Sequence, residues 1–242
     1  MPILAVDAGN SRIKWGLWDG SWSRQDWVAT TELARLAAEW RTLPPLRLLI
    51  ACSVAASPVT EWIETWARRT GVKLRWVISQ REACGVRNSY LEPSQLGADR
   101  WAALIAAHHL MSGAVLTASV GTAVTVDALA QDGEFLGGLI LPGLDLMAEA
   151  LASRAAGLTR SHGAVALFPR TTADAIASGA VQSICGAIER MERVLAQRHA
   201  EPQIVLTGGG AEVIRSHLGR TAQLVPNLVL EGLRIVAGSE LE

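Results

Sequence analysis

Along residues 1–20, apolar runs alternate with small polar clusters. A β-prone run at 3–6 ends in Asp7-Ala8-Gly9-Asn10-Ser11, and a second run at 12–18 stops at Asp19-Gly20. An Asp-Gly pair between two β-prone runs is a strong hairpin signal. The pattern therefore predicts a strand, a tight polar turn over 7–11 (the first turn), a second strand, a hairpin turn and a third strand.

From residue 31 to residue 111, the spacing of apolar residues predicts alternating helices and strands. Leu33, Leu36 and Trp40 recur at helical spacing and stop before two prolines. Ser57-Pro58 predicts a helix N-cap followed by proline, and Gly71 ends that helix. The expected elements are a helix over 31–42, a strand over 46–54, a helix over 57–70, a strand over 72–78, a loop over 85–93 and a helix over 96–111.

The opening pattern returns from residue 114 onward. In order, the pieces are an apolar run at 114–118, Ser119-Val120-Gly121-Thr122 (the second turn), a β-prone run at 123–130, Asp132-Gly133 and an apolar run at 135–141. The second turn stands where Asp7-Ala8-Gly9-Asn10 stood, and Asp132-Gly133 stands where Asp19-Gly20 stood. A repeat of this length indicates two copies of one α/β unit, with phosphate between two facing turns. The alternative is a coincidence between two ordinary hairpins.

The junction of the two units is expected near Ser112-Gly113, which divides the chain into 1–112 and 113–242. The second unit continues with helices over 143–157 and 172–198. The longer one carries an apolar stripe from Ile176 to Leu195, typical of core or partner-helix packing. A strand over 203–207 then ends in Gly208-Gly209-Gly210 before a helix at Ala211. Glycines between strand and helix suit close approach of a nucleotide, although they also mark ordinary turns.

Composition narrows the function classes. The chain has 242 residues, half of them hydrophobic, so it can bury a sizeable core. Its 22 basic and 23 acidic residues leave a net charge of −1, which argues against nucleic-acid and membrane-surface partners. The three cysteines are far apart and fit neither a metal site nor a disulfide framework. With no signal-peptide pattern and no apolar stretch of membrane-spanning length, a cytoplasmic protein is expected.

The first turn carries candidate phosphate chemistry. Gly9 lets backbone N–H groups approach a phosphate closely, and Asn10 and Ser11 add small donors. Asp7, at the carboxyl end of a buried strand, is placed to hold Mg²⁺ bound to those phosphates. Arg12 and Lys14 share one face of the second strand, because side chains there alternate. The alternative is a plain hairpin in which Asp7 only caps a turn.

Five motifs together carry a family resemblance. They are Asp7-Ala8-Gly9-Asn10-Ser11, the run from Tyr90 to Gly97-Ala98-Asp99-Arg100, the run from Gly121-Thr122 to Asp127, Gly137-Gly138 with Pro142-Gly143, and Thr207 to Gly210. With them the chain resembles the type III pantothenate kinases, in the acetate/sugar kinase, Hsp70 and actin superfamily. The resemblance implies an α/β fold of duplicated ribonuclease H-like units, with mixed sheets flanked by helices and an ATP cleft between the units.

The resemblance also implies an activity: ATP-dependent phosphorylation of pantothenate to 4'-phosphopantothenate, the first step of coenzyme A biosynthesis, in a homodimer. It implies ATP with Mg²⁺, the ion held through Asp7, and K⁺ or NH₄⁺. The implied ATP contacts are Asp7, Ala8, Gly9, Asn10, Ser11, Arg12, Ile13, Lys14 and Thr122. The implied substrate contacts are Tyr90, Gly97, Ala98, Asp99, Arg100 and, across the dimer, Thr172.

The residues can support this chemistry unaided. Asp99 can act as general base for a primary hydroxyl, and Arg100 can fork onto the carboxylate of an acidic substrate. Each residue also has a plainer interpretation. These are a helix-dipole carboxylate for Asp99, a surface ion pair for Arg100, a loop anchor for Tyr90, a β-branched strand residue for Thr122, a helix N-cap for Thr172 and a solvated lysine for Lys14. Asp127 is a further carboxylate expected near the site, without an assigned role.

One residue departs from the family pattern. Ser119 stands where the family usually carries an aspartate that helps to hold a monovalent cation, so the K⁺ or NH₄⁺ site is expected to be weakened.

Two rival functions stay open: a kinase of the same superfamily with another small hydroxyl acceptor, and a non-enzymatic accessory regulator of gene expression. The neutral charge and the lack of a helix-turn-helix pattern argue against direct DNA binding by such a regulator.

Overall fold

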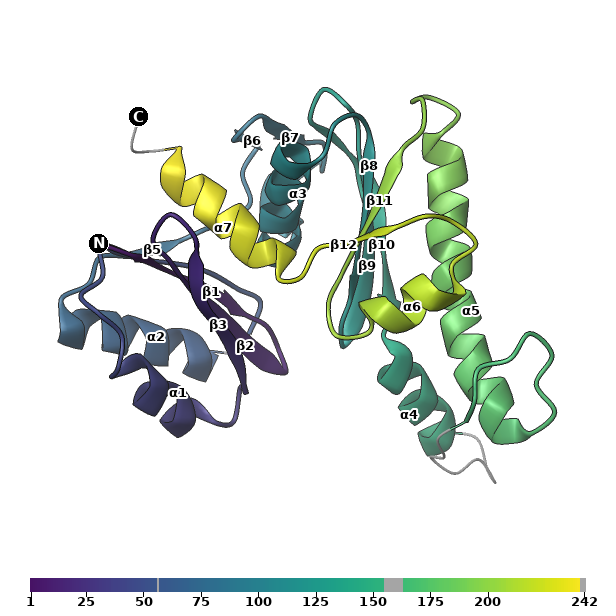
Figure 1. The fold of residues 1–242 in the computed structure, drawn as a ribbon, viewed down its shortest axis with the longest axis horizontal. Helices are drawn as coiled ribbons and strands as arrows, with labels where there is room; N and C mark the ends of the chain where they lie inside the picture. Colours follow the sequence, from purple (N-terminus) through teal and green to yellow (C-terminus); the bar gives the residue numbers. More distant parts are fainter. Residues whose placement is uncertain (56, 155–162, 240–242) are drawn as a thin grey trace. The chain divides into compact units, whose positions relative to one another are not determined.

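The computed structural model describes residues 1–55, 57–154 and 163–239 (Figure 1). Its internal contacts divide the chain into two units. Met1–Leu110 and the segment from Asn227 onward form the first unit, and Met111–Pro226 forms the second. The first boundary lies close to the expected junction. The division 113–242, however, assigns the last helix to the second unit, whereas the structure packs that helix into the first.

The first unit is built on a mixed five-stranded sheet with strand order β3-β2-β1-β4-β5. The strands are β1 (Ile3–Ala8), β2 (Arg12–Trp18), β3 (Trp22–Ala29), β4 (Leu48–Ser53) and β5 (Leu74–Trp76). β1, β2 and β3 are antiparallel neighbours, whereas β4 and β5 run parallel to β1. The hairpins predicted at the first turn and at Asp19-Gly20 are confirmed, and Gly20 has the positive φ of 82° that such a turn demands.

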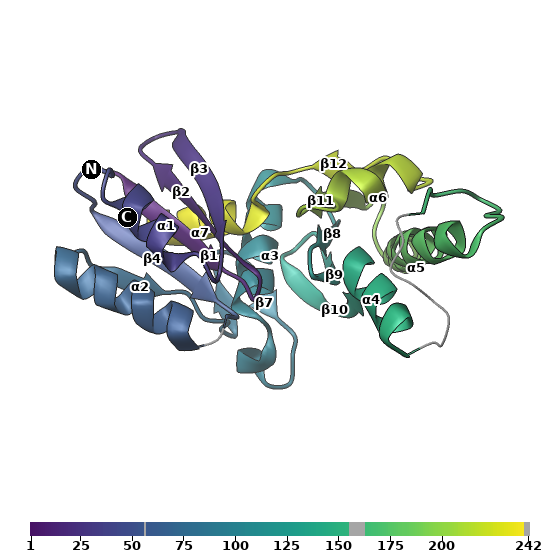
Figure 2. The ribbon, with the colours of Figure 1, turned by 90° about the horizontal axis from the view of Figure 1, so that it is seen from below.

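Helices cover both faces of this sheet. α1 (Leu33–Trp40) and α2 (Ser57–Thr70) lie on one face, and α7 (Leu228–Gly238) lies on the other, against β1 and β4 (Figures 1 and 2). Trp40 anchors the first face, because its ring lies 6.5 Å from that of Trp15, 5.4 Å from Trp62 and 4.9 Å from Trp66. Large aromatic rings thus fill much of this core.

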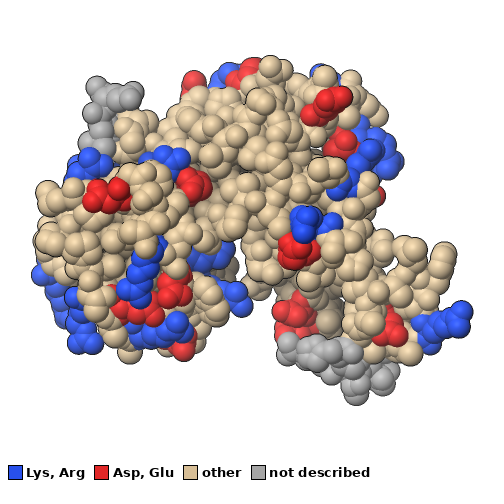
Figure 3. Space-filling model, viewed as in Figure 1, with Lys and Arg blue, Asp and Glu red and all other residues tan. Residues whose placement is uncertain are grey.

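Charged side chains of both signs lie on the surface. Arg35 on α1 lies 3.0 Å from Glu39, and basic and acidic side chains are interspersed on the face drawn in Figure 3.

α3 (Ala98–Leu110) packs against α7. A Cβ on Gly232 of α7 would collide with the backbone of Ala102 on α3, so the two helices cross at close range. This explains the alanine-rich α3, because small residues let two helix backbones approach. The loop expected over 85–93 instead holds β7 (Val86–Asn88), which pairs with β6 (Glu82–Ala83) just before it and is followed by the short 3₁₀ helix η1 (Pro93–Gln95). Cys84 and Gly85 both have positive φ, as a tight hairpin between these strands needs.

The second unit repeats the first. Its strands are β8 (Val115–Val120), β9 (Ala123–Leu129), β10 (Glu134–Pro142), β11 (Gln203–Thr207) and β12 (Gln223–Leu224), in the order β10-β9-β8-β11-β12. β8 pairs antiparallel with β9 and parallel with β11, as β1 does with β2 and β4. The strand order and directions of the first unit recur, so the internal repeat predicted from the two turns is confirmed.

The described part of the second unit holds the helices α4 (Leu144–Arg154), α5 (Thr172–Leu195) and α6 (Ala211–His217). The stripe on α5 is buried, with Ile184 and Ile188 in the core formed with the sheet. The expected end of the helix over 143–157 lies outside the described residues. α5 is capped by the side chain of Thr171, which accepts from the N–H of Asp174 at 3.2 Å, so the interpretation of Thr172 as the cap is wrong. Among the described residues, no helix is long and apolar enough to cross a membrane.

Candidate active site

The first turn is closed by its own backbone. The N–H of Gly9 donates to the carbonyl of Arg12 at 3.0 Å, and a Cβ on Gly9 would lie 3.2 Å from that oxygen. Thr30 donates to the carbonyl of Ser11 through its N–H at 3.1 Å and to that of Asn10 through its hydroxyl at 3.2 Å. The turn is therefore tight, and Asn10 and Ser11 are exposed at its tip.

Asp7 lies below this turn, 7 % exposed, in a row of side chains across the sheet. Its register partners are Lys14 on β2 and Cys52 on β4. The Lys14 Nζ lies 3.8 Å from one carboxylate oxygen, and the Cys52 Sγ lies 3.9 Å from the other. Burial raises the pKa of Asp7 to about 6, Lys14 opposes this rise, and the negative charge of Asp99 adds to it. Asp99 is therefore close enough to Asp7 for its charge to affect the pKa of Asp7.

The other predicted ATP contacts of the first unit differ in their exposure to solvent. Ala8 and Ile13 are fully buried, so only their backbone atoms can face a nucleotide. Arg12 is exposed and its guanidinium lies over the ring of Trp27, 4.1 Å from the centroid. The pattern of the first turn gave no sign of Trp27 or Cys52, because both come from strands that reach the turn only through sheet pairing.

The acceptor site (Tyr90, Gly97, Ala98, Asp99 and Arg100) forms where α3 begins. Asp99 lies in the first helical turn, where its Oδ1 accepts from the N–H of Arg100 at 2.8 Å. A Cβ on Gly97 would come 2.6 Å from that oxygen, so glycine leaves room for the carboxylate. Arg100 is only 6 % exposed, and its guanidinium donates to the Tyr90 hydroxyl at 3.1 Å. The interpretation of Arg100 as part of a surface pair is therefore wrong.

Three residues that hold this site were not predicted from the sequence: Ser79, Arg81 and Asn88. The side chain of Asn88 accepts from the N–H of Tyr90 at 3.1 Å and donates to the carbonyl of Pro93 at 3.1 Å. An asparagine that bonds the backbone two residues later is a common turn device, and Asn88-Ser89-Tyr90 could have indicated it. Ser79 and Arg81 offer no such local signal.

The second turn resembles the first. The N–H of Gly121 donates to the carbonyl of Ala123 at 3.1 Å, as Gly9 does to Arg12. Two further glycine segments surround it. A Cβ on Gly143 would collide with the carbonyl oxygens of Gly121 and Thr122, and Gly208, with φ of 95°, lies against the backbone of Val120. The backbones at the ends of β8, β10 and β11 therefore meet here, which explains why these predicted motifs carry glycine.

The remaining predicted residues of the second unit are spread over several elements. Thr122 is exposed on the second turn, and Thr172 is exposed at the start of α5. Ser119 pairs in register with Thr125 and Thr207, so hydroxyl side chains stand where the first unit has Lys14, Asp7 and Cys52. Asp127 is buried inside the sheet opposite Thr117, away from the turn itself.

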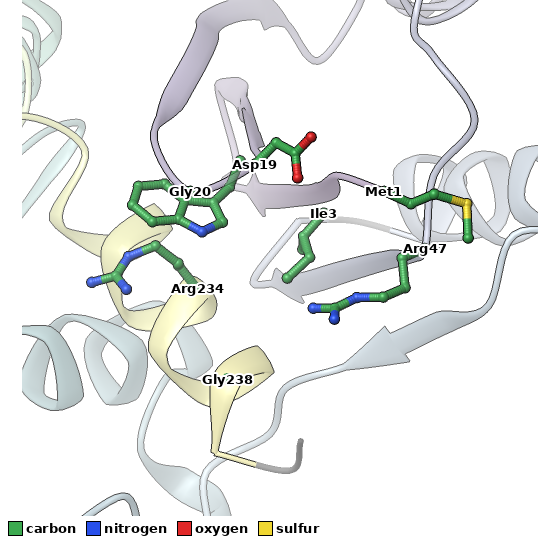
Figure 4. A pocket seen from close by; sticks show the side chains of 8 residues that line it. Met1, Ile3, Asp19, Gly20, Arg47, Arg234 and Gly238 are labelled. Atoms are coloured by element: carbon green, nitrogen blue, oxygen red, sulfur yellow. The ribbon is translucent and has the colours of Figure 1, made fainter. Parts of the chain in front are cut away.

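A separate hollow of about 280 Å³ lies in the first unit, and Ile3, Asp19, Arg47 and Arg234 are among the residues that line it (Figure 4). Arg234 stacks on Trp18 at 4.6 Å and pairs with Glu231 at 2.9 Å. None of the predicted site residues lines this hollow. The candidate active site is therefore the group formed by the first turn and the start of α3.

Solved structures share this fold. An MreB5 from Spiroplasma citri bound to ADP matches with a TM-score of 0.53 and 10% identity, over 99% of this chain and 97% of that chain. A structure assigned to the Baf family of transcriptional activators, from Campylobacter jejuni, matches with a TM-score of 0.67 and 18% identity, over 99% and 100%. At such identities the likeness shows the fold alone. The protein therefore has the mixed α/β fold of the actin, Hsp70 and sugar-kinase type, as the sequence predicted.

Relatives of higher sequence identity show which family the chain belongs to. The family model for type III pantothenate kinase matches residues 3–194. A type III pantothenate kinase of Nitrosospira multiformis is 42% identical over 97% of this chain and 90% of its own length. That of Chromobacterium violaceum is 44% identical over 98% of this chain and 99% of its own length. The chain belongs to the type III pantothenate kinase family.

Proposed function

We propose that this protein transfers a phosphoryl group from ATP to the terminal hydroxyl of pantothenate, producing 4'-phosphopantothenate in the first step of coenzyme A biosynthesis. Membership of the family supports the reaction. The observation that carries the proposal is the acceptor site, where Asp99 precedes the buried Arg100 and its partner Tyr90, and where the charge of Asp99 affects the pKa of Asp7 in the first turn. The carboxylate proposed for the hydroxyl and the cation proposed for an acidic substrate thus belong to the same unit as the turn proposed to bind phosphate.

On the acceptor side, Asp99 takes the proton of the attacking hydroxyl. Arg100, oriented by Tyr90, binds the carboxylate of pantothenate, because a guanidinium matches a carboxylate in charge and in planar geometry. Phosphoryl transfer needs positioning and charge neutralisation more than covalent chemistry. These residues supply positioning and a proton acceptor.

On the nucleotide side, the backbone N–H groups and small side chains of the first turn bind the phosphates, and Thr122 is a further proposed ATP contact. The residues fit a Mg²⁺ that arrives with ATP: Asp7 offers a carboxylate, and Mg²⁺ prefers one or two carboxylates together with phosphate oxygens. Among the described residues, no group of three or more His, Cys, Asp or Glu side chains could hold a metal ion. Mg²⁺ would neutralise charge on the phosphates, and Lys14 lies close enough to add to this effect.

The proposal includes a homodimer in which Thr172 contacts substrate bound by the partner. The α5 stripe does not support it, because those residues are buried in their own unit. Exposed apolar residues support it instead: Leu146 and Leu151 on α4, and Leu167 and Phe168 just before α5. Leu167 and Phe168 are 82% and 89% exposed, and a group of such side chains is typical of an interface.

The proposal also includes a cytoplasmic location, since Cys52, Cys84 and Cys185 are free thiols.

The test is an activity assay with the purified chain, ATP, Mg²⁺ and pantothenate, with the product identified by mass. A parallel screen offers other small hydroxyl compounds, including pantothenyl alcohol, which lacks the carboxylate that Arg100 is proposed to bind. We expect 4'-phosphopantothenate and a clear preference for pantothenate over the alcohol. A better acceptor of another class would favour the rival superfamily kinase, and absence of turnover on pantothenate would contradict the proposal.

A further inference from the structure

One short segment touches both parts of the acceptor site. Residues 79–81 follow β5 and precede β6, and they lie between the loop that carries Tyr90 and the start of α3. The side chain of Arg81 reaches the loop, and the side chain of Ser79 reaches the residues before Asp99. Neither residue belongs to the predicted or proposed binding groups.

The side chain of Arg81 binds backbone carbonyls of the loop that carries Tyr90. Its guanidinium donates to the carbonyls of Asn88 at 3.1 Å, Tyr90 at 3.0 Å and Leu91 at 3.3 Å. The neighbouring Leu91 is 99% exposed, so its side chain does not anchor this end of the loop in the core. Loops without buried apolar contacts open readily. The three hydrogen bonds from Arg81 are therefore a main restraint on the position of Tyr90.

Asn88 extends this restraint. It is only 2% exposed, and its side chain joins the N–H of Tyr90 to the carbonyl of Pro93. Its own N–H donates to the carbonyl of Arg81 at 2.9 Å. The loop and the segment 79–81 are thus joined by both backbone and side-chain hydrogen bonds.

Ser79 connects the same segment to α3. Its hydroxyl, 8% exposed, lies 2.7 Å from the carbonyl of Leu96 and 3.5 Å from that of Gly97. The contacts form a closed ring. It runs from Arg100 to Tyr90, through the loop to Arg81, along the chain to Ser79, and back through Leu96 to the start of α3.

We propose that Arg81 is a positioning residue for the acceptor site, which holds the Tyr90 loop so that the Tyr90 hydroxyl meets the Arg100 guanidinium in the orientation that binds the substrate carboxylate. The inference rests on the proposed function and adds a residue to it. A guanidinium can serve three carbonyls at once because its N–H groups form a fixed planar fork, whereas a lysine ammonium of the same charge cannot reproduce that geometry.

The test compares Arg81→Lys with Arg69→Lys, the same substitution at an exposed arginine on α2. For Arg81→Lys we expect the KM for pantothenate to rise about tenfold and the KM for ATP to stay within about twofold, since a supporting contact orients the ligand group without touching it. Hydrogen exchange should quicken in the peptide that contains residues 88–91. Arg69→Lys should match the wild type in each measurement.

Tyr90→Phe removes the hydroxyl through which Arg81 is proposed to act. In the Tyr90→Phe background, Arg81→Lys should therefore add little to the KM for pantothenate. Fully additive effects, an equal rise of both KM values, or an unchanged KM for pantothenate would overturn the inference while leaving the proposed function intact. A wild-type protein that does not phosphorylate pantothenate would instead overturn the proposed function, and this inference with it.

Discussion

Asp7 and Asp99 are the two carboxylates of the proposed site, and they lie in different surroundings. Asp7 is buried between Lys14 and Cys52, and this burial raises its pKa. Asp99 is partly exposed in the first turn of α3, beside the Arg100–Tyr90 pair. The buried carboxylate suits a role with the metal-bound phosphates, and the partly exposed one suits contact with an incoming hydroxyl. Substitutions at the two positions should therefore have different effects.

Asp99→Asn should remove most turnover and leave the fold and ATP binding intact. Asparagine keeps the shape of the side chain but cannot accept the proton, and loss of a general base typically slows a reaction about 10²–10⁴-fold. The measurements are kcat with pantothenate, ATP affinity by calorimetry, and circular dichroism. A rate close to that of the wild type would exclude Asp99 as the base.

Asp7→Asn should weaken the use of Mg²⁺–ATP and stabilise the free protein above pH 6. Folding raises the pKa of Asp7 from the ordinary value of 3.8 to about 6, because the buried carboxyl resists ionisation. The wild type therefore loses stability as the pH rises from 3.8 to 6. At about 1.36 kcal/mol per pH unit, the difference reaches about 3 kcal/mol. Asparagine cannot ionise and avoids this loss.

Urea unfolding of the nucleotide-free protein with EDTA checks this expectation. Asp7→Asn should unfold at higher urea than the wild type at pH 8, and the two should nearly coincide at pH 4. The exposed Asp19→Asn is the control and should change little at either pH. A wild type that is the more stable protein at pH 8 would show that Lys14 more than compensates for the burial of Asp7.

At the scale of elements, the two turns repeat in backbone but differ in chemistry. The row Lys14, Asp7, Cys52 of the first unit corresponds to Thr125, Ser119, Thr207 of the second. One row holds a carboxylate beside an ammonium, and the other holds hydroxyl groups. The duplicated turn therefore offers neutral oxygen ligands in the second unit.

Stimulation by K⁺ or NH₄⁺ should be weaker than the family pattern implies, and Ser119→Asp should increase it. A carboxylate offers a cation two charged oxygens, whereas a serine hydroxyl offers one neutral oxygen. The measurement is rate against KCl concentration, with tetramethylammonium chloride keeping the ionic strength constant because salt also screens surface charge. A wild type that is silent without K⁺ and saturates steeply with it would show that other groups hold the ion.

Element prediction succeeded where the signal was local. The first turn, the Asp-Gly hairpins and the glycine segment after β11 lie where their short motifs predicted. The hairpin β6–β7 was missed, because its turn residues Cys84 and Gly85 do not form a familiar turn pair. The α5 stripe was predicted as core or partner packing, and only the sheet beneath it decided for core.

At the scale of the whole molecule, the chain is a duplication whose last helix returns to the first unit. α7 follows β12 in sequence, but its residues Leu230 and Leu233 are buried and the helix packs against β1, β4 and α3. The first unit therefore needs both ends of the chain. The acceptor site lies at the start of α3, the helix that α7 supports, so completion of the first unit and support of the site are linked.

The protein should form a homodimer in solution. Light scattering should give twice the chain mass of 25.8 kDa, since the exposed apolar residues near the start of α5 would be covered by a second copy. Phe168→Glu should weaken the dimer and leave circular dichroism unchanged. Val213→Glu, at an exposed apolar position on α6, is the matched control and should stay dimeric. A monomer at micromolar concentration in an active wild-type preparation would contradict this expectation.

The sequence by itself determined the parts that depend on neighbouring residues: the polar turns, the repeat, the existence of the helix that carries Asp99, and the family motifs. These follow from backbone preferences and spacing over a few residues, which a single sequence displays directly. Only the tertiary structure decided that Arg100 is buried against Tyr90, that Asp7 lies between Lys14 and Cys52, that Arg81 holds the Tyr90 loop and that α7 completes the first unit. Each of these depends on which strands and helices become neighbours. That choice is made by burial of apolar surface over the whole chain, so no short stretch of sequence records it.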